Sequence, residues 1–243
     1  MSASTLAPML TVENLHAWYD HSHVLQGVSL EARAGEIVSI IGRNGAGKTT
    51  TLRTIMGLVK KCRGEVAFDG AAGLLERPAH ARYRLGLGYV PEDRRIVPGL
   101  TVRENLRLGL VSSPLKKRES EIIDRIAETF PRLKERRDQI AETMSGGEQQ
   151  MLAIARATAS QPRMVMLDEP SEGIMPMLVD EMFELFVRLK ETGTTILLVE
   201  QNVERALSIS DRAYIMDHGV IVHQAPAADL LADKAIQDRY CSV

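Results

Sequence analysis

The sequence of 243 residues predicts an α/β fold in which a mainly parallel sheet is flanked by helices. Three short apolar runs, Val38–Ile41, Met164–Leu167 and Thr195–Val199, have the length and composition of buried strands. Helical stretches follow the first two: Lys48–Leu58, and Val179–Glu191, whose apolar residues recur at i, i+3, i+4 and i+7. This alternation is typical of parallel strands joined by crossover helices.

Two other regions add smaller subdomains to this core. Leu10–Ala34 and Glu65–Gly70 alternate apolar and polar residues, which predicts antiparallel strands with one solvated face. The charged middle of the chain, residues 101–137, contains no strand pattern, and Ser120–Phe130 has the spacing of an amphipathic helix. We therefore expect one domain over residues 1–243. Within it, residues 1–92 and 150–243 form the α/β core with an N-terminal antiparallel β subdomain, and residues 93–149 form an inserted α-helical subdomain.

The composition excludes several classes of protein. The 30 Lys and Arg residues nearly balance 32 Asp and Glu residues, which argues against a dedicated nucleic-acid binder. No apolar run approaches the roughly 20 residues that span a bilayer, and Met1–Met9 has no signal-peptide pattern. The two cysteines, Cys62 and Cys241, lie far apart, and we expect free thiols. These features predict a soluble cytoplasmic protein.

A glycine-rich segment after the first buried strand carries the clearest chemistry. Residues Gly42–Thr49, here called the phosphate loop, match the pattern GxxxxGK[ST] between a strand and a helix. Glycines let successive backbone N–H groups point at phosphate oxygens, and the helix N-terminus adds partial positive charge. Lys48 is expected to reach the β- and γ-phosphates, and the Thr49 hydroxyl to ligate Mg²⁺. The predicted nucleotide-binding residues here are Gly42, Arg43, Asn44, Gly45, Ala46, Gly47, Lys48, Thr49 and Thr50. They predict a P-loop nucleotidase core.

Two carboxylates stand at the end of the second buried strand. Asp168 and Glu169 follow Met164–Leu167, and the carboxyl end of a parallel strand faces the ligand crevice. Asp168 is predicted to hold Mg²⁺, and Glu169 to polarise the water that attacks the γ-phosphate.

A third motif indicates which P-loop family the chain resembles. The segment Thr143–Gln150, here called the signature segment, reads TMSGGEQQ and resembles the LSGGQ motif of ATP-binding cassette (ABC) ATPases. The resemblance implies that Ser145, Gly146, Gly147 and Glu148 bind the ATP held on the phosphate loop of a second subunit. Two ATP molecules would thus be enclosed between two subunits. The resemblance also places a segment that crosses to the second subunit at Ser171–Ile174.

Further positions carry roles by the same resemblance. Tyr19 stands where the family stacks an aromatic ring on adenine, with Trp18 as the neighbouring alternative. Glu92 replaces the family's usual glutamine and is expected to ligate Mg²⁺. Gln201 replaces the usual switch histidine and is expected to contact the γ-phosphate, with Glu200 as the alternative residue for that position.

Several stretches resemble one subgroup, the LivF-type ATP-binding subunits of branched-chain amino-acid importers. They are Tyr89–Glu92, Leu100–Leu106, Met144–Arg156 and Leu198–Asn202. The resemblance implies a peripheral subunit on the cytoplasmic face of the inner membrane that uses ATP and Mg²⁺. Its expected partners are a second ABC ATPase subunit (self or a sister chain), membrane permeases and, indirectly, a periplasmic solute-binding protein.

The expected solute is a branched-chain or other hydrophobic amino acid. Urea or a short amide is the alternative, because the ATPases of importers for those solutes have similar sequence motifs. A soluble ABC ATPase that acts on nucleic acid or ribosomes is a more distant alternative. The length and the balanced charge of the chain disfavour it.

Overall fold

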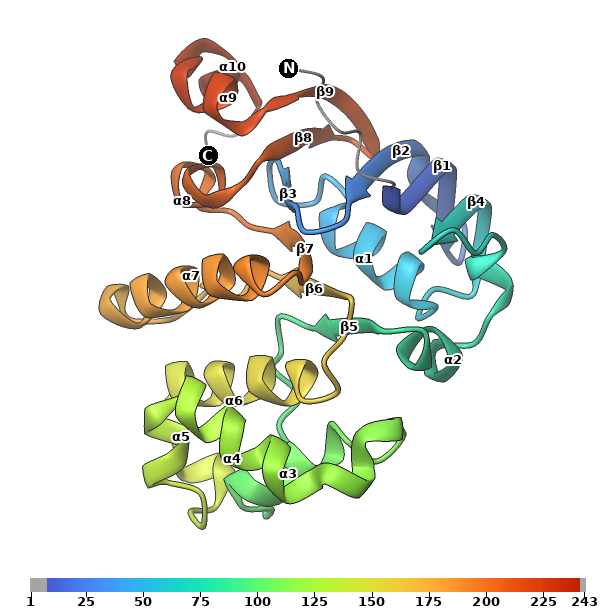
Figure 1. Cartoon of the computed structure of the whole chain (residues 1–243). Coiled ribbons are helices and arrows are strands. Elements are labelled where there is room, and N and C mark those ends of the chain that lie inside the picture. Colours follow the sequence, from blue (N-terminus) through green and yellow to red (C-terminus); the bar gives the residue numbers. More distant parts are fainter. Residues whose placement is uncertain (1–7, 241–243) are drawn as a thin grey trace, which may run out of the picture.

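The computed structural model describes residues 8–240, arranged around a six-stranded sheet with helices on both faces (Figure 1). The strand order is β5-β6-β7-β3-β8-β9, and all neighbours are parallel except β8 and β9. The strands are β3 (Ile37–Ile41), β5 (Leu87–Val90), β6 (Met164–Asp168), β7 (Thr195–Val199), β8 (Arg212–Asp217) and β9 (Val220–Pro226). Every residue of β3, β6 and β7 is buried, so the three predicted buried strands are confirmed.

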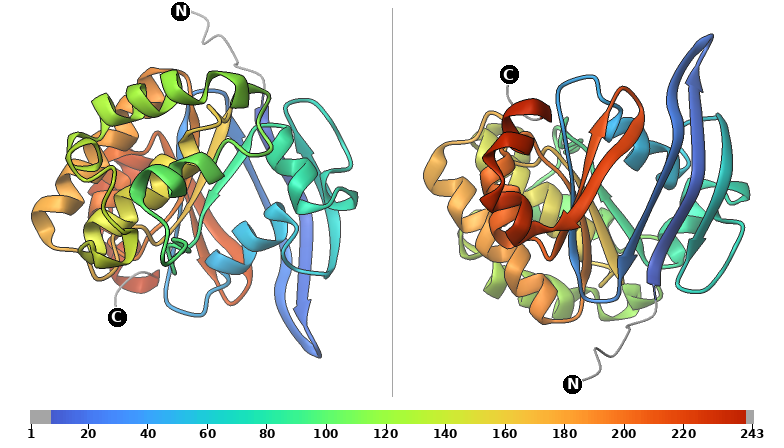
Figure 2. Two further views of the ribbon diagram at one scale, coloured as in Figure 1. Left: turned by 90° about the horizontal axis from the view of Figure 1, so that it is seen from below. Right: turned by 90° about the horizontal axis from the view of Figure 1, so that it is seen from above.

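The antiparallel strands form a separate three-stranded sheet. Its order is β2-β1-β4, with β1 (Pro8–Tyr19), β2 (Ser22–Arg33) and β4 (Lys61–Phe68). Figure 2 shows this sheet at one side of the molecule, with α1 (Lys48–Met56) between it and the six-stranded sheet. The predicted bounds of β4 were wrong. The strand starts earlier than Glu65 and stops at Phe68, because Asp69 and Gly70 adopt positive φ and turn the chain.

The middle of the chain is helical, as its pattern indicates. The helices are α3 (Val102–Leu108), α4 (Glu119–Thr129) and α5 (Pro131–Glu135), and with α6 (Gly146–Thr158) they form the lower layer in Figure 1. The other helices are α2 (Ala79–Arg84), α7 (Pro176–Glu191), α8 (Val203–Ile209), α9 (Ala227–Ala232) and α10 (Lys234–Tyr240). Short 3-10 turns lie at Leu74–Glu76, Pro114–Arg118 and Ala141–Thr143. No helix within residues 8–240 is long and apolar enough to cross a membrane.

Two predicted helices have different ends in the structure. Helix α1 stops at Met56 rather than Leu58, because Gly57 adopts a left-handed conformation with φ +83°. The Gly57 and Leu58 N–H groups then donate to carbonyls of the last turn, which is a common way to end a helix. Helix α7 begins at Pro176 rather than Val179, since a proline fits the first helical turn without losing a hydrogen bond.

The core has two parts, one on each face of the six-stranded sheet. Ile37 and Ile41 of β3 pack with the helical layer, while Val38 and Ile40 pack with α1 and the antiparallel sheet. The thiol of Cys62 in β4 is free and half-buried. Cys241 and most of the segment Met1–Met9 lie outside residues 8–240, so the predictions made for them fall outside the described part of the chain.

A buried arginine, which the sequence analysis did not single out, joins α1 to α2. Arg82 is 2% exposed, and its guanidinium donates to the carbonyls of Thr54 and Ile55 at the end of α1, at 2.9 and 2.6 Å. It also donates to the carbonyls of Arg77 and Leu75, at 2.7 and 2.9 Å. These bonds hold in place the helix that carries the phosphate loop at its other end.

The replacement Arg82→Ala is therefore expected to lower the free energy of unfolding by about 3–4 kcal/mol, because two buried and two partly buried carbonyls lose their donor. The expected fall in melting temperature is roughly 10 °C. Thermal unfolding would measure it, with Arg84→Ala as the control, since Arg84 lies exposed on the same helix. Equal melting temperatures for the two variants would contradict this role for Arg82.

Candidate functional site

The phosphate loop lies between the carboxyl end of β3 and the start of α1. Gly42 has φ +149°, and a Cβ atom at this position would lie 2.1 Å from the carbonyl oxygen of Met216 in β8. No side chain fits there, so the glycine lets the loop pass close to the neighbouring strand. The backbone can then curve around the side chain of Lys48.

Lys48 is buried at the centre of this curve. Its ammonium donates to the carbonyl oxygens of Gly42 and Arg43, at 2.9 and 3.2 Å. It also forms an ion pair with Glu169, with 3.5 Å between Nζ and Oε1, and the two side chains are only 3% and 9% exposed. The structure thus brings together two residues that were predicted to act on the same phosphate.

The second predicted carboxylate contacts the other end of the motif. The Thr49 hydroxyl donates to Asp168 Oδ1 at 2.8 Å, and the Tyr89 hydroxyl donates to Asp168 Oδ2 at 2.9 Å. Burial raises the pKa of Asp168, while these two hydrogen bonds oppose the rise. Tyr89 was quoted in the sequence only as part of a resemblance. Its place in β5, which pairs with β6, was the signal that could have assigned it to the site.

Gln201 contacts Glu169 from the loop after β7. The Gln201 amide donates to Glu169 Oε2, and the Glu169 N–H donates to the Val199 carbonyl at 2.8 Å. Glu169 itself has φ +46°, a conformation that is uncommon for a residue with a side chain. The backbone of Glu169 is thus held at the end of β7, and its carboxylate lies between Lys48 and Gln201.

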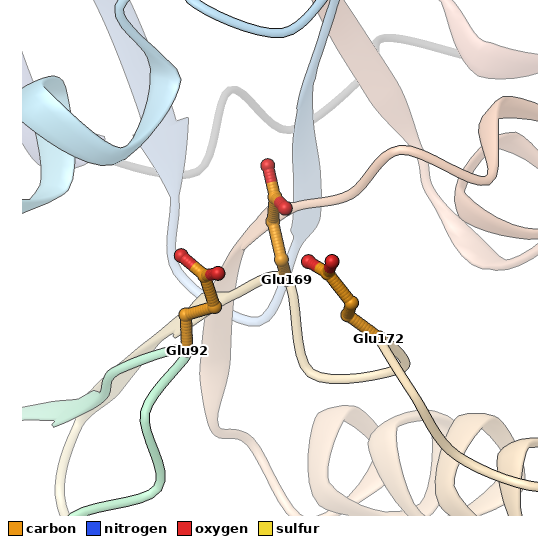
Figure 3. A group of neighbouring side chains, drawn as sticks. All are labelled: Glu92, Glu169 and Glu172. Atoms are coloured by element: carbon orange, nitrogen blue, oxygen red, sulfur yellow. The ribbon is translucent and has the colours of Figure 1, made fainter.

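Three glutamates lie close together, as Figure 3 shows, and one of them is the Glu169 that pairs with Lys48 of the phosphate loop. Glu92 follows β5, Glu169 follows β6, and Glu172 lies in the loop before α7. Carboxylate oxygens of all three lie within 4.8 Å of one another. Burial and the charges of Glu169, Asp168 and Asp93 raise the pKa of Glu92. A hydrogen bond with Glu169 and burial raise the pKa of Glu172. Negative charge is therefore concentrated around Glu169, and Glu172 is a member that the sequence analysis did not predict.

The side-chain oxygens in this region suit a magnesium ion as ligands. The hydroxyl of Thr49 and the carboxylates of Asp168 and Glu92 offer only oxygen, which is the ligand type that Mg²⁺ prefers. The structure joins Thr49 to Asp168 directly, while it groups Glu92 with Glu169 and Glu172.

The signature segment forms the N-terminus of α6. Ser145 caps this helix, and Glu148 accepts from the Ser145 N–H at 3.0 Å and from the Ser145 hydroxyl at 2.9 Å. The other oxygen of Glu148 pairs with Arg136 at 2.9 Å. The Glu148 N–H donates to the Ser145 hydroxyl at 3.4 Å, and the capping box leaves the N–H groups of Gly146 and Gly147 directed out of the helix end. The carboxylate of Glu148 serves the cap itself.

The two aromatic residues at the end of β1 have different surroundings. Trp18 stacks on His23 with 4.4 Å between ring centroids, and Lys61 and Arg63 lie over the same ring. Tyr19 is 42% exposed. Of the two predicted positions, Tyr19 therefore has the more accessible ring.

The fold and this site define a P-loop nucleotidase: a parallel α/β core with a phosphate loop, a buried lysine and an acidic pair at the neighbouring strand end. Residues 25–172 match the family described as ABC transporter. The chain is 42% identical over 232 residues to the high-affinity branched-chain amino acid transport ATP-binding protein BraG of Pseudomonas aeruginosa. That match covers 96% of this chain and 99% of BraG.

Two further comparisons agree with this one. The chain is 37% identical to the probable branched-chain amino acid transport ATP-binding protein LivF of Archaeoglobus fulgidus, over 92% of this chain and 94% of that protein. It also resembles the ATP-binding cassette MJ0796 in its dimeric, post-hydrolysis state bound to ADP and phosphate. There the TM-score is 0.78 and the identity 26%, covering 90% of this chain and 99% of that one. The chain belongs to the ABC transporter family and is one of its ATPases, as the signature segment indicated.

Proposed function

We propose that this ATPase is the motor subunit of a membrane importer for branched-chain or other hydrophobic amino acids. The observation that carries the motor role is the convergence of Lys48 and Gln201 on the buried Glu169, beside the Thr49–Asp168 pair. The solute class rests on the similarity to BraG and LivF along almost the whole chain. The same motor role in a urea or short-amide importer is the second candidate.

The residues around the phosphate loop have separate roles in ATP hydrolysis. Backbone N–H groups of the phosphate loop and the Lys48 ammonium bind the phosphates of ATP, since both are hydrogen-bond donors and the lysine charge is buried. Thr49, Asp168 and Glu92 hold Mg²⁺, which supplies positive charge for the developing negative charge on the phosphates. Tyr19 stacks on the adenine ring.

Glu169 and Gln201 act at the γ-phosphate. The Glu169 carboxylate accepts a proton from the attacking water, and its place between Lys48 and Gln201 aims it at the phosphate loop. The Gln201 amide donates a hydrogen bond and, unlike histidine, does not titrate. No step at this position therefore depends on an imidazole.

A second ATPase subunit completes the site. Ser145 and Glu148 bond to each other in the capping box described above. The N–H groups of Gly146 and Gly147 at the start of α6 therefore remain for a ligand. In the dimer that we propose, Ser145, Gly146 and Gly147 of one subunit bind the ATP on the phosphate loop of the other. The dimeric state of the related cassette MJ0796 supports this arrangement.

The permease is proposed to bind a groove between the core and the helical layer. The groove has a volume of 360 Å³, and exposed Leu58 and Leu108 stand on its two sides, 42% exposed each. Arg94 and Arg95, which both have positive φ, line it next to Pro91. A permease helix seated there would touch the segment that begins at Glu92 and would connect the transport path to the nucleotide. The subunit would thus lie on the cytoplasmic face of the inner membrane, with a periplasmic solute-binding protein on the other side.

Solute uptake tests the proposed function. In a strain that lacks this chain, restoring it should restore uptake of radiolabelled leucine, isoleucine and valine, and the Glu169→Gln variant should fail to do so. Uptake of urea or a short amide in place of amino acids would move the assignment to the second candidate. Unchanged uptake of all of these solutes would contradict the transport role.

The role of Gln201 gives a separate prediction. The change Gln201→Ala should lower kcat about 10- to 100-fold with little change in ATP affinity, because one donor to the γ-phosphate is lost. The change Gln201→His should introduce a pH-dependent limb near the histidine pKa of about 6.5, which the unaltered enzyme lacks at this position. Pre-steady-state and pH–rate measurements would show both effects. Full turnover in Gln201→Ala would refute the role.

A further inference from the structure

A carboxylate outside the roles assigned above lies buried at the end of β7. Glu200 is 1% exposed. Its Oε1 accepts from the Ser171 N–H at 3.0 Å, and its Oε2 accepts from the N–H groups of Gln201 and Asn202 at 3.0 and 3.3 Å. One side chain therefore connects the loop after β6 to the loop after β7.

In these surroundings both carboxylate oxygens of Glu200 must act as hydrogen-bond acceptors. All three backbone partners are donors, and none of them carries a charge. Burial raises the pKa of Glu200, while the hydrogen bonds from these groups oppose the rise. The ionised carboxylate is the one form of this side chain that accepts at both ends without donating.

The two connected loops carry the groups that act on the γ-phosphate. Ser171 stands two residues after Glu169, and Gln201 directly follows Glu200. The loops also meet where the Glu169 N–H donates to Val199 and where the Gln201 amide donates to Glu169. Glu200 adds a connection at Ser171, the first residue of the Ser171–Ile174 segment.

We infer that Glu200 is a positioning residue that holds Glu169, Gln201 and the Ser171–Ile174 segment in one arrangement. Its oxygens face backbone N–H groups, and the contact with Glu169 comes from Gln201, so Glu200 acts through its neighbours. A displacement of one segment, including one imposed by a second subunit, is thereby passed to the reacting carboxylate. The inference rests on the proposed function only for the roles of Glu169 and Gln201.

The variant Glu200→Gln tests this inference because it keeps the shape of the side chain. Whichever way the amide is turned, its NH₂ group faces a backbone donor, so one of the two loops is released. We expect kcat to fall about tenfold or more, since small displacements of a catalytic group are costly. The dissociation constant for ATP should change less than about twofold, because the hydrogen bonds of Glu200 described above go to Ser171, Gln201 and Asn202 and not to the phosphate loop. Glu200→Asp, which keeps the charge, should recover part of the lost kcat.

Hydrogen exchange supplies a readout that needs no ATP. Peptides that cover residues 169–175 should exchange faster in Glu200→Gln than in the unaltered protein. The matched control is Glu36→Gln. Glu36 also accepts hydrogen bonds, from the Arg33 backbone N–H and from the Arg212 guanidinium, both at 2.8 Å. It lies before β3, at the end opposite to the phosphate loop. The control should lower the melting temperature without changing kcat or exchange in 169–175.

Three results would overturn the inference: unchanged kcat in Glu200→Gln, unchanged exchange in residues 169–175, or a loss of ATP affinity and melting temperature that accounts for the loss of kcat. Failure of the proposed function would look different. In that case Glu169→Gln would keep its turnover, while the exchange result for Glu200→Gln would still stand.

Discussion

Replacement of Glu169 by glutamine is expected to lower ATP turnover by about 10²- to 10⁴-fold, because an amide cannot accept the proton of the attacking water. ATP binding should persist and become tighter, since a negative charge next to the γ-phosphate has been removed. The variant should therefore accumulate as an ATP-bound dimer. Phosphate release measures the first effect, and size-exclusion chromatography with and without ATP measures the second.

The control for this variant is Glu184→Gln, which removes the same charge from an exposed position on α7. It should turn over ATP at the normal rate and should form no stable dimer. Normal turnover in Glu169→Gln would reject the assignment of Glu169 as the reacting carboxylate, and with it the roles of the groups that contact it.

Lys48→Ala should abolish turnover and weaken ATP binding about 100-fold, which corresponds to about 2.7 kcal/mol. The ammonium is the buried cation of the phosphate loop, and the backbone N–H groups cannot replace its charge. Titration with a fluorescent ATP analogue measures the affinity.

Lys60→Ala is the matched control, since Lys60 is exposed shortly after α1. It should bind ATP normally. Unchanged ATP affinity in Lys48→Ala would contradict the phosphate-binding role of the lysine.

The parts of the fold and site that the sequence predicted are those that depend on short segments. The buried strand Thr195–Val199 was identified with its true bounds, because a β-branched threonine followed by four consecutive apolar residues is typical of a buried strand. The phosphate loop was identified because its glycines and Lys48 are contiguous. Asp168 and Glu169 were placed correctly beside it, because the carboxyl ends of parallel strands share one edge.

The residues that were missed act across long separations in the chain. Arg82 was not singled out, because nothing in its neighbourhood shows that its guanidinium reaches the end of α1, 27 residues away from it in sequence at Ile55. Glu200 was named only as an alternative to Gln201, since its bond to Ser171 depends on the adjacency of β6 and β7. Tyr89 was likewise without a role until β5 and β6 were paired. Such contacts follow from sheet order, which spacing alone does not specify.

The ion pair between Lys48 and Glu169 has a consequence for the protein without nucleotide. Glu169 acts there as an internal counter-ion, so the lysine charge is already neutralised before ATP arrives. The incoming phosphate therefore competes with the protein's own carboxylate for the same ammonium, and each binding event exchanges one anion for another. The same exchange would release Glu169 from Lys48, so under the proposed mechanism the carboxylate that accepts the proton of water becomes free only when there is a phosphate to attack.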